Sequence, residues 1–415
     1  MMRGLALLLS VLAATSCVRY QSSPTGGRID SLTLNLLEPT EVGTPTDPIA
    51  TRSARFDLFA RDDQGAQVDE DVAVDLYLAS GGQKTGVLNG CSVAEASKTP
   101  LATVNLVAGE LRDYFLDLPQ AFGASAIWAE IPSAGAAGAS PVIYFRNPFI
   151  SDLTTPPDLT SPKVAFCNPY TGKFVRIDKA TGTGRLYVSA VFTNAFVMID
   201  SGATKFNAIY VFTFGRPSRN IVPGQPLDWV TGNIAKFNGF TQLSFPRYEA
   251  SSDEPDLSAL PKPVKLTNVD LSDVPKMLQY VSRTVSVTGK ICNPFPNNPN
   301  DNPDIQRTRD SWLSFNQFVL DADTTCSSIS NYTIALPAKK VGDFDPLQRI
   351  GDTITVTGVL RNSSGQNPVT DADGNKVACD DSTPCPSGNC QDDGYCYKTA
   401  FNFWTVYPTT ASDLN

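Results

Sequence analysis

Three basic and two aromatic side chains stand close together in the middle of the chain, in a pattern that could bind a polymer. They are Lys205, Tyr210, Phe212, Arg216 and Arg219, in and around the apolar run AIYVFTF. Aromatic rings stack on bases or sugars, and cations neutralise phosphate or carboxylate groups, so this combination is typical of surfaces that hold an extended anionic chain. We treat these five residues as candidate ligand contacts. The alternative is that Tyr210 and Phe212, which share one strand face, belong to the core.

Charge is distributed unevenly along the sequence. Residues 161–250 contain ten basic and four acidic residues, a net charge of +6, whereas the whole chain carries −9. Residues 28–150 carry −8 and residues 281–415 carry −5. Because clustered cations attract anions even on a protein of negative net charge, we expect the middle segment to contact nucleic acid or acidic polysaccharide.

Histidine is absent from all 415 residues. This absence excludes Ser-His-Asp and Cys-His hydrolases and histidine-ligated metal sites. Carboxylate, lysine or tyrosine chemistry remains, but no spacing typical of it occurs. We therefore expect a protein that is not an enzyme and has no cofactor, with a carboxylate-based hydrolase as the minor alternative, because the separation of two catalytic carboxylates is a tertiary property.

Acidic loops raise the alternative of calcium. Residues 371–375, Asp-Ala-Asp-Gly-Asn, supply alternate oxygen ligands, but their glycine comes two positions too early for an EF-hand loop and no glutamate follows at the twelfth position. The acidic stretches at 62–63 and 69–71 are similar in composition. We interpret all three as solvated turns and predict no metal site.

The N-terminus has the layout of a secretory signal, with Arg3, a short apolar run and then small residues. A bilayer span needs about twenty apolar residues, so this run is too short for a permanent membrane helix. The sequence Ala14-Thr-Ser-Cys17 resembles a bacterial lipobox, although alanine replaces the usual leucine. The resemblance implies cleavage after residue 16 and lipidation of Cys17. Val18, in place of aspartate, implies an outer-membrane lipoprotein facing the periplasm or the cell surface. An ordinary signal peptide is the alternative.

Eight further cysteines follow, and an even number in an exported chain favours disulfides. They are Cys91, Cys167, Cys292, Cys326, Cys379, Cys385, Cys390 and Cys396. Zinc is the competing interpretation for the last four, but no CxxC pair occurs. We expect Cys292 to pair with Cys326. Among the three connectivities of the last four, we favour first-to-third with second-to-fourth, which leaves Cys91 for Cys167.

The sequence predicts that the elements which position these residues are β-strands throughout. Apolar residues alternate in short runs between turns, and 31 prolines and 29 glycines punctuate the chain. After a linker at 17–27, residues 28–150 hold about six such runs, which predicts an immunoglobulin-like sandwich. Residues 160–275 predict a five-stranded Greek-key barrel, with a glycine in the fourth strand where the strand must bend.

The first barrel is similar to the oligonucleotide/oligosaccharide-binding (OB) domain that precedes the catalytic domain of secreted bacterial nucleases. VTGNIAKFNGFTQL at 230–243 and LPKPVKLTNVDL at 260–271 carry this resemblance. It covers about a quarter of the chain and implies the OB fold; the nuclease domain itself is absent. On that fold, ligands are expected on strands two and three, where Phe196, Tyr210 and Phe212 would lie.

A second barrel is predicted at 280–415, because ITVTGVL around Gly358 repeats the VTGN motif at Gly232. The first copy is one residue longer before its glycine, so it needs a bulge or a longer turn. An unrelated sandwich is the alternative. The cysteine-rich insertion at 379–396 resembles a short disulfide-knotted motif of Gram-negative surface proteins.

Two hypotheses for function follow. In the first, the chain is a non-catalytic binding, adhesion or structural module of the envelope that contacts a polyanion through the basic barrel. In the second, it is an assembly component of an envelope complex that binds a protein partner and no polymer. Fold alone does not choose between them.

Overall fold

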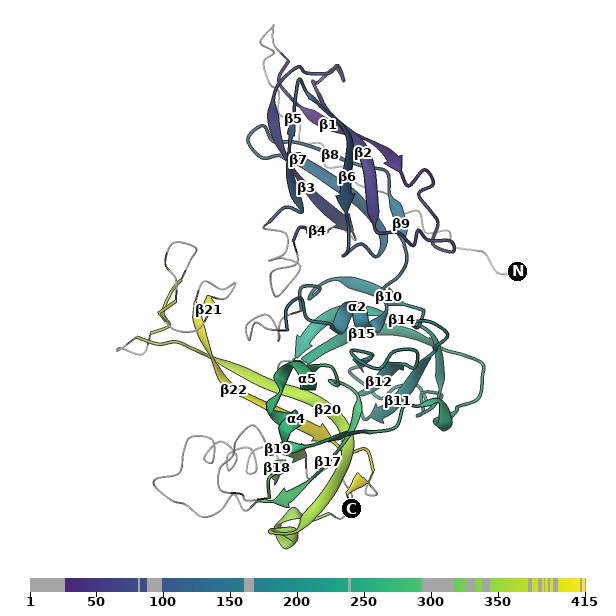
Figure 1. The fold of residues 1–415 in the computed structure, drawn as a ribbon, viewed down its shortest axis with the longest axis vertical. Helices are drawn as coiled ribbons and strands as arrows, with labels where there is room; N and C mark the ends of the chain where they lie inside the picture. Colours follow the sequence, from purple (N-terminus) through teal and green to yellow (C-terminus); the bar gives the residue numbers. More distant parts are fainter. Residues whose placement is uncertain are drawn as a thin grey trace, which may run out of the picture.

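The computed structural model describes residues 27–80, 83–87, 99–159, 168–237, 240–292, 317–324, 326, 333–337, 344–371, 375–379, 383, 385–386, 389–390, 395–410 and 413–414. Strands dominate and form three sheets in chain order, with a few short helices (Figure 1). The expected all-β architecture is confirmed. Cys17, Cys91 and Cys167 lie outside the described residues, so the statements about them stay predictions.

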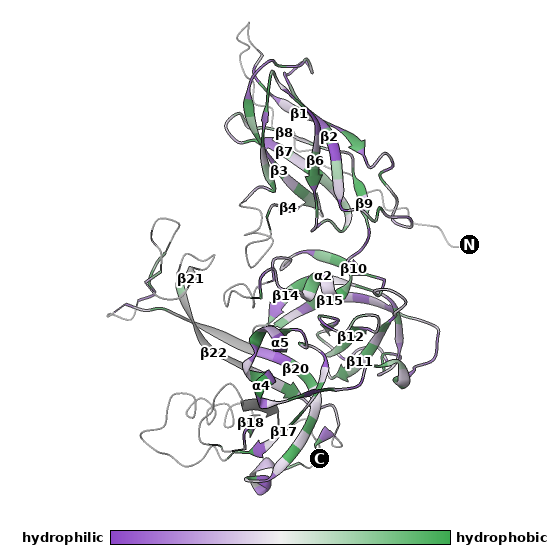
Figure 2. Ribbon diagram, viewed as in Figure 1, coloured by the Kyte–Doolittle hydropathy of each residue, from purple (hydrophilic) through white to green (hydrophobic). Residues whose placement is uncertain are grey.

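The first sheet is a sandwich with one core. Its strands are β1 (Ser31–Glu38), β2 (Ser53–Arg61), β3 (Val72–Ser80), β4 (Gln83–Thr85), β5 (Ala102–Leu106), β6 (Glu110–Asp117), β7 (Gly123–Ile131), β8 (Ala136–Ala139) and β9 (Ile143–Phe145). The strand order is β4-β3-β7-β8-β1-β2-β6, and the β1–β2–β6 layer joins the other layer where Ser31 pairs with Ala137. Hydrophobic and hydrophilic residues alternate along these strands (Figure 2), so each layer turns one face inward.

A short helix connects the sandwich to the next sheet. In α2 (Ile150–Thr154), the buried side chains Ile150 and Leu153 pack into the core of the first barrel. Phe122, from the sandwich, packs into the same core. The two modules therefore share apolar contacts across their connection.

The second sheet is a closed barrel. Its strands are β10 (Phe174–Ile177), β11 (Leu186–Phe192), β12 (Ala195–Asp200), β13 (Ala208–Phe212), β14 (Pro226–Phe237) and β15 (Phe240–Ala250). β11 pairs with β12 and β14, β13 pairs with β12, and β15 closes the ring by pairing parallel with β13 and antiparallel with β14. This ring of five strands is the strand order of an OB barrel, as predicted.

The third sheet repeats that ring. Its elements are β16 (Val264–Leu266), α4 (Asn268–Ser272), α5 (Val274–Leu278), β17 (Thr284–Ile291), β18 (Gln317–Asp321), β19 (Thr333–Pro337), β20 (Thr353–Pro368), β21 (Asn389–Cys390) and β22 (Cys396–Tyr407), with 3-10 turns at Leu257–Ala259 and Pro346–Arg349. β17, β18, β19, β22 and β20 close in the same order, with β19 and β22 parallel. The two rings therefore have identical topology.

One segment lies with a different barrel from the one that the sequence suggested. β16 pairs parallel with β17 of the second ring, and Leu266, Leu271 and Leu278 belong to the core of that ring. The apolar side chains of residues 264–278 pack in the second barrel, although we expected residues 264–275 to end the first. Local pattern showed that the segment was structured, but it could not show which core would receive it.

The glycines that matched between the two copies have the same role. A Cβ on Gly232 would lie 3.0 Å from the carbonyl oxygen of Ser244, and a Cβ on Gly358 would lie 2.5 Å from that of Tyr407. In each barrel the fourth strand thus approaches the fifth closely at a glycine. A Cβ on Gly358 would clash with the fifth strand, whereas a Cβ on Gly232 would make a tight contact with it. The expected irregularity of the first copy is also present, because the β14–β15 register shifts between Leu227 and Trp229, where β14 carries one extra residue before Gly232.

Candidate functional site

The outer face of β12 and β13 is covered by the second barrel. All six residues of β12 are buried: Phe196 and Met198 face the barrel interior, whereas Val197 and Ile199 pack outward against a cluster that includes Val359 of β20. Strands buried on both faces carry nearly continuous apolar runs, and AFVMI is such a run. The face on which an OB barrel is expected to hold its ligand is therefore an interface within this chain.

Tyr210 lies in that interface and not on the open surface. Its side chain is only 5% exposed, and its ring centre lies 5.5 Å from that of Phe240. Burial raises the pKa of Tyr210, and the nearby Arg361 guanidinium offsets part of that rise. Phe196 is fully buried as well. Neither Tyr210 nor Phe196 can contact a ligand from solvent in this arrangement, so the prediction that these two residues bind a ligand is wrong.

Arg361 of β20 enters an aromatic cage formed by both barrels. Its guanidinium carbon lies 4.0 Å from the ring centres of Tyr210 and Tyr407, 5.1 Å from that of Phe240 and 5.2 Å from that of Phe192. The side chain is buried, and its Nε and Nη2 atoms have no hydrogen-bond partner among the described residues. Cation–π attraction is strongest when the cation is desolvated, so this contact holds the two barrels together.

Phe212 leads from the covered face to an exposed aromatic cluster. The ring centres of Phe212 and Phe214 are 4.5 Å apart, and those of Phe214 and Phe245 are 4.6 Å apart. Phe214 is 54% exposed and Phe245 is 69% exposed. We name Phe212, Phe214 and Phe245 the phenylalanine cluster. Large exposed rings in mutual contact are unusual on a soluble surface and commonly mark a binding site.

The backbone holds two of these rings outward at a cost in strain. Phe214 has φ 62° and Phe245 has φ 53°, values in the left-handed region that residues other than glycine rarely adopt. Phe245 lies at the register shift of β15, where Thr231 pairs with Arg247 and Asn233 pairs with Ser244. The extra residues of the bulge turn the Phe245 ring away from the core.

Three arginines accompany the phenylalanine cluster. Arg216 and Arg219 are exposed on the loop after β13, and Arg247 is exposed on β15 two residues after Phe245. None of the three forms an ion pair with another described residue. Glu249, the next exposed residue on that face, accepts a hydrogen bond from Trp229 Nε1 at 2.7 Å. We name Arg216, Arg219 and Arg247 the arginine set.

Hydrogen bonds to Tyr248 position the loop that carries two of these arginines. The Ser218 backbone N–H donates to the Tyr248 hydroxyl at 3.1 Å, and the Ser218 hydroxyl lies 2.9 Å from it. Tyr248 in turn packs edge-on against Phe196, with ring centres 5.1 Å apart. The loop is thereby tied to the barrel core, which reduces the entropy lost when a ligand binds.

Lys205 does not join the other candidates. It is exposed in the turn between β12 and β13, at the opposite end of β13 from Arg216. The five predicted contacts therefore divide: Phe212, Arg216 and Arg219 stay together, Tyr210 is buried, and Lys205 lies apart. Phe214, Phe245 and Arg247 were missed. The sequence did show Phe214 before Gly215 and Phe245 before Pro246, each in a turn-like context. Only the tertiary structure brings these two rings together.

Two of the predicted disulfides are present. Cys292 pairs with Cys326, and Cys385 pairs with Cys396, the second and fourth cysteines of the insertion as favoured from the sequence. Cys379 is also disulfide-bonded. The groups of described side chains that approach metal-binding distance contain these same cystine sulfurs.

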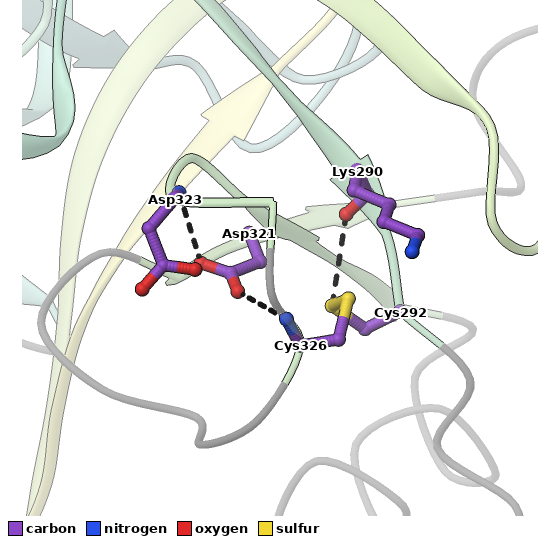
Figure 3. The surroundings of a disulfide bond; sticks show 5 residues. All are labelled: Lys290, Cys292, Asp321, Asp323 and Cys326. Carbon is purple, nitrogen blue, oxygen red and sulfur yellow. Dashed lines mark hydrogen bonds between the residues drawn. A yellow bond between two sulfur atoms is a disulfide. The ribbon is translucent and has the colours of Figure 1, made fainter.

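Asp321 organises the turn that carries Cys326 (Figure 3). Its carboxylate accepts hydrogen bonds from the backbone N–H groups of Cys326, at 2.7 Å, and Asp323, at 3.3 Å. The side chain is fully buried, and burial together with the neighbouring Asp323 carboxylate raises the pKa of Asp321. The carboxylate thus satisfies backbone donors beside the disulfide.

Acidic loops act as turns where they are described. Asp62 accepts hydrogen bonds from the backbone of Gln64 and Ala66, and Asp371 accepts one from Asn375. Local bonds of this kind are the usual use of aspartate in turns. These contacts agree with the interpretation of the loops as turns.

A buried lysine that the sequence did not mark lies between the sandwich and the first barrel. Lys173 is 5% exposed, and its Nζ lies 5.6 Å from the Phe122 ring centre without a hydrogen-bond partner among the described residues. The Arg52 guanidinium lies 4.1 Å from the same ring and bonds to Asp152. Burial, with a contribution from Arg52, lowers the pKa of Lys173 to about 8.

No helix in the described part of the chain is long and apolar enough to cross a membrane. The chain matches no known protein family, and no curated protein has significant sequence similarity to it.

Proposed function

We propose that this chain is a non-catalytic binding module of the cell envelope whose first barrel holds an extended anionic polymer. The phenylalanine cluster and the arginine set form the contact surface. One observation carries the proposal: the exposed rings of Phe214 and Phe245 contact each other, in strained backbone conformations, and three exposed arginines without ion pairs accompany them. Strain is retained in proteins mainly where it has a use.

The chemistry of this surface favours a polymer over a small ligand. Stacked rings offer flat apolar faces to bases or sugars, while guanidinium groups bind phosphate or carboxylate oxygens in pairs. Nucleic acid and acidic polysaccharide both supply flat groups and repeated negative charge. The acidic sandwich and second barrel would repel such a polymer, which confines it to the first barrel.

Attachment to the outer membrane is part of the same proposal. Cleavage before Cys17 and lipidation of its sulfur would tether the chain, with the sandwich closest to the membrane in sequence. Metabolic labelling with a fatty acid is the direct test. The wild-type chain should incorporate the label and Cys17→Ser should not.

A protein-assembly role is the second candidate. The β20–β22 ribbon extends beyond the second barrel (Figure 1), and its far part carries the Cys385–Cys396 disulfide. A rigid projecting ribbon offers an edge to another protein. This role predicts co-purifying envelope proteins and indifference to polyanions.

Fluorescence titration of the mature chain separates the two candidates. The ligands are labelled single-stranded DNA and a labelled acidic polysaccharide, at about 50 and 200 mM salt. Phe214→Ala/Phe245→Ala should weaken binding at least about tenfold, because each stacked base is worth about 1–3 kcal/mol. Leu257→Ala/Val269→Ala, which removes two exposed apolar side chains elsewhere, is the control. If the chain binds neither polymer, the proposal of a polymer-binding surface is wrong and the protein-assembly role is favoured.

A further inference from the structure

A small pocket lies where the two barrels and α2 meet, away from the phenylalanine cluster. Its volume is about 40 Å³, and its lining includes Lys236 and Thr241 from the β14–β15 hairpin, Asn168, Phe206 and Ser282. A volume of this size holds about three water molecules. A polar group of about three heavy atoms therefore fits the pocket.

Strained backbone forms two walls of this pocket. Phe206 has φ 50° and Ser282 has φ 67°, both in the left-handed region. Each is held by a backbone hydrogen bond, from Phe206 N–H to the Gln279 carbonyl at 2.9 Å and from Ser282 N–H to the Leu360 carbonyl at 2.8 Å. Two such residues in one small cavity indicate that its shape is maintained against local preference.

Hydroxyl groups in the pocket are free to donate. Thr241 Oγ1 accepts a hydrogen bond from Asn168 Nδ2 at 3.0 Å, so its own hydrogen remains available. Ser282 is 1% exposed and lines the pocket, and its hydroxyl makes no hydrogen bond to another described residue. A buried polar group normally has a partner, so the pocket offers unused donors to an acceptor.

The charge around the pocket is positive. Lys236 is half-buried, forms no ion pair with a described residue, and burial lowers its pKa to about 8. Arg283, next to Ser282, is buried and bonds to the Thr204 carbonyl oxygen, and its pKa is lowered by burial. Arg361 contacts Phe240, another residue of the lining. No carboxylate in the described chain pairs with any of these three cations.

We propose that this pocket binds one small free carboxylate ion through the Lys236 ammonium group and the hydroxyls of Thr241 and Ser282. A carboxylate accepts several hydrogen bonds in one plane and supplies the missing negative charge. Because the lining comes from both barrels, the bound ion stabilises their arrangement. This site is independent of the polymer surface and of its test.

Protection of Lys236 from an amine-acylating reagent tests the proposal on the intact mature chain. Formate is the probe, and the acetylation rate of each lysine is read by peptide mass spectrometry at pH 8. Formate at about ten times its dissociation constant occupies most sites and should slow Lys236 acetylation about tenfold. Lys265, exposed on β16, is the internal control and should react at an unchanged rate.

The variant Ser282→Gly tests the pocket without removing the lysine. Glycine accepts the left-handed backbone, so the fold should be kept while one donor is lost. Protection of Lys236 by formate should then weaken severalfold. The proposal is overturned if formate leaves Lys236 unprotected, protects Lys236 and Lys265 equally, protects Ser282→Gly as well as wild type, or is matched by phosphate at equal concentration.

Discussion

The guanidinium carbon of Arg361 lies 4.0 Å from the ring centre of Tyr210, and this contact joins the two barrels. It occupies the strand face on which an OB barrel is expected to bind its ligand. The chain has therefore used that face for its own assembly. The surface left for a polymer begins at Phe212, where the covered face ends and the exposed rings continue.

Replacing Arg361 should weaken the barrel pair. Arg361→Ala removes two close cation–π contacts, each worth about 2 kcal/mol when desolvated, and also removes buried nitrogens that lack partners. We expect the free energy of unfolding to fall by about 1–3 kcal/mol in urea titrations. Arg247→Ala, on the surface, should change it by less than about 0.5 kcal/mol. Equal effects of the two variants would show that the cage contributes no stability.

Stability should rise with pH above neutrality because of Lys173. Its pKa is about 8 in the folded chain and about 10.4 when unfolded. Below pH 8 Lys173 is protonated in both the folded and the unfolded chain, so the folded chain bears the full cost of burying its charge. From pH 8 to 10 the unfolded state binds more protons, so the penalty disappears, a gain of about 3 kcal/mol.

Lys173→Met should therefore be more stable than wild type at pH 7, and this advantage should shrink as the pH rises to 10. Urea titrations of both proteins at each pH measure this difference in the free energy of unfolding. Lys179→Met, at an exposed position, should show no such convergence with wild type. A constant difference between wild type and Lys173→Met across this range contradicts the assignment.

Disulfide mapping checks the described cysteines. Peptides from the unreduced protein should link Cys292 to Cys326 and Cys385 to Cys396. The first bridge spans 34 residues, so Cys292→Ala/Cys326→Ala should lower the free energy of unfolding by about 4 kcal/mol on the chain-entropy estimate. Cross-links between other pairs would contradict the fold of the second barrel.

Gly358 should tolerate no side chain. A Cβ there would lie 2.5 Å from the Tyr407 carbonyl oxygen, so Gly358→Ala must displace the closing strand and should cost about 1–3 kcal/mol of unfolding free energy. Gly215 has open space around its Cα, and Gly215→Ala is the matched control. Equal thermal stability of the two variants would show that the barrel closes differently.

Local sequence pattern predicted the strands, both barrels and the bulge of the first. Alternation and glycine spacing are local signals, and Gly232 and Gly358 have the same role because the same close approach of strands recurs. The covered face was harder to predict. Val197 and Tyr210 are apolar enough for an interface, but nothing local shows which module covers them.

The candidate site was only half predictable for a similar reason. Arg216 and Arg219 stood out by charge, whereas Phe245 and Arg247 come from a strand about thirty residues later and reach the same edge only after β13 and β15 pair. Lys173 and Lys236 carried no local signal, because the burial that lowers their pKa values is created by tertiary packing.

The salt dependence of polymer binding tests the central claim most directly. With three arginines neutralising phosphates of single-stranded DNA, the slope of log affinity against log salt should be about −2. Arg216→Gln/Arg219→Gln/Arg247→Gln should bring the slope close to zero, whereas Lys179→Gln/Lys262→Gln/Lys265→Gln, three exposed lysines elsewhere, should leave it unchanged. An unchanged slope in the arginine variant, or an equal loss in the lysine variant, would contradict binding at this surface.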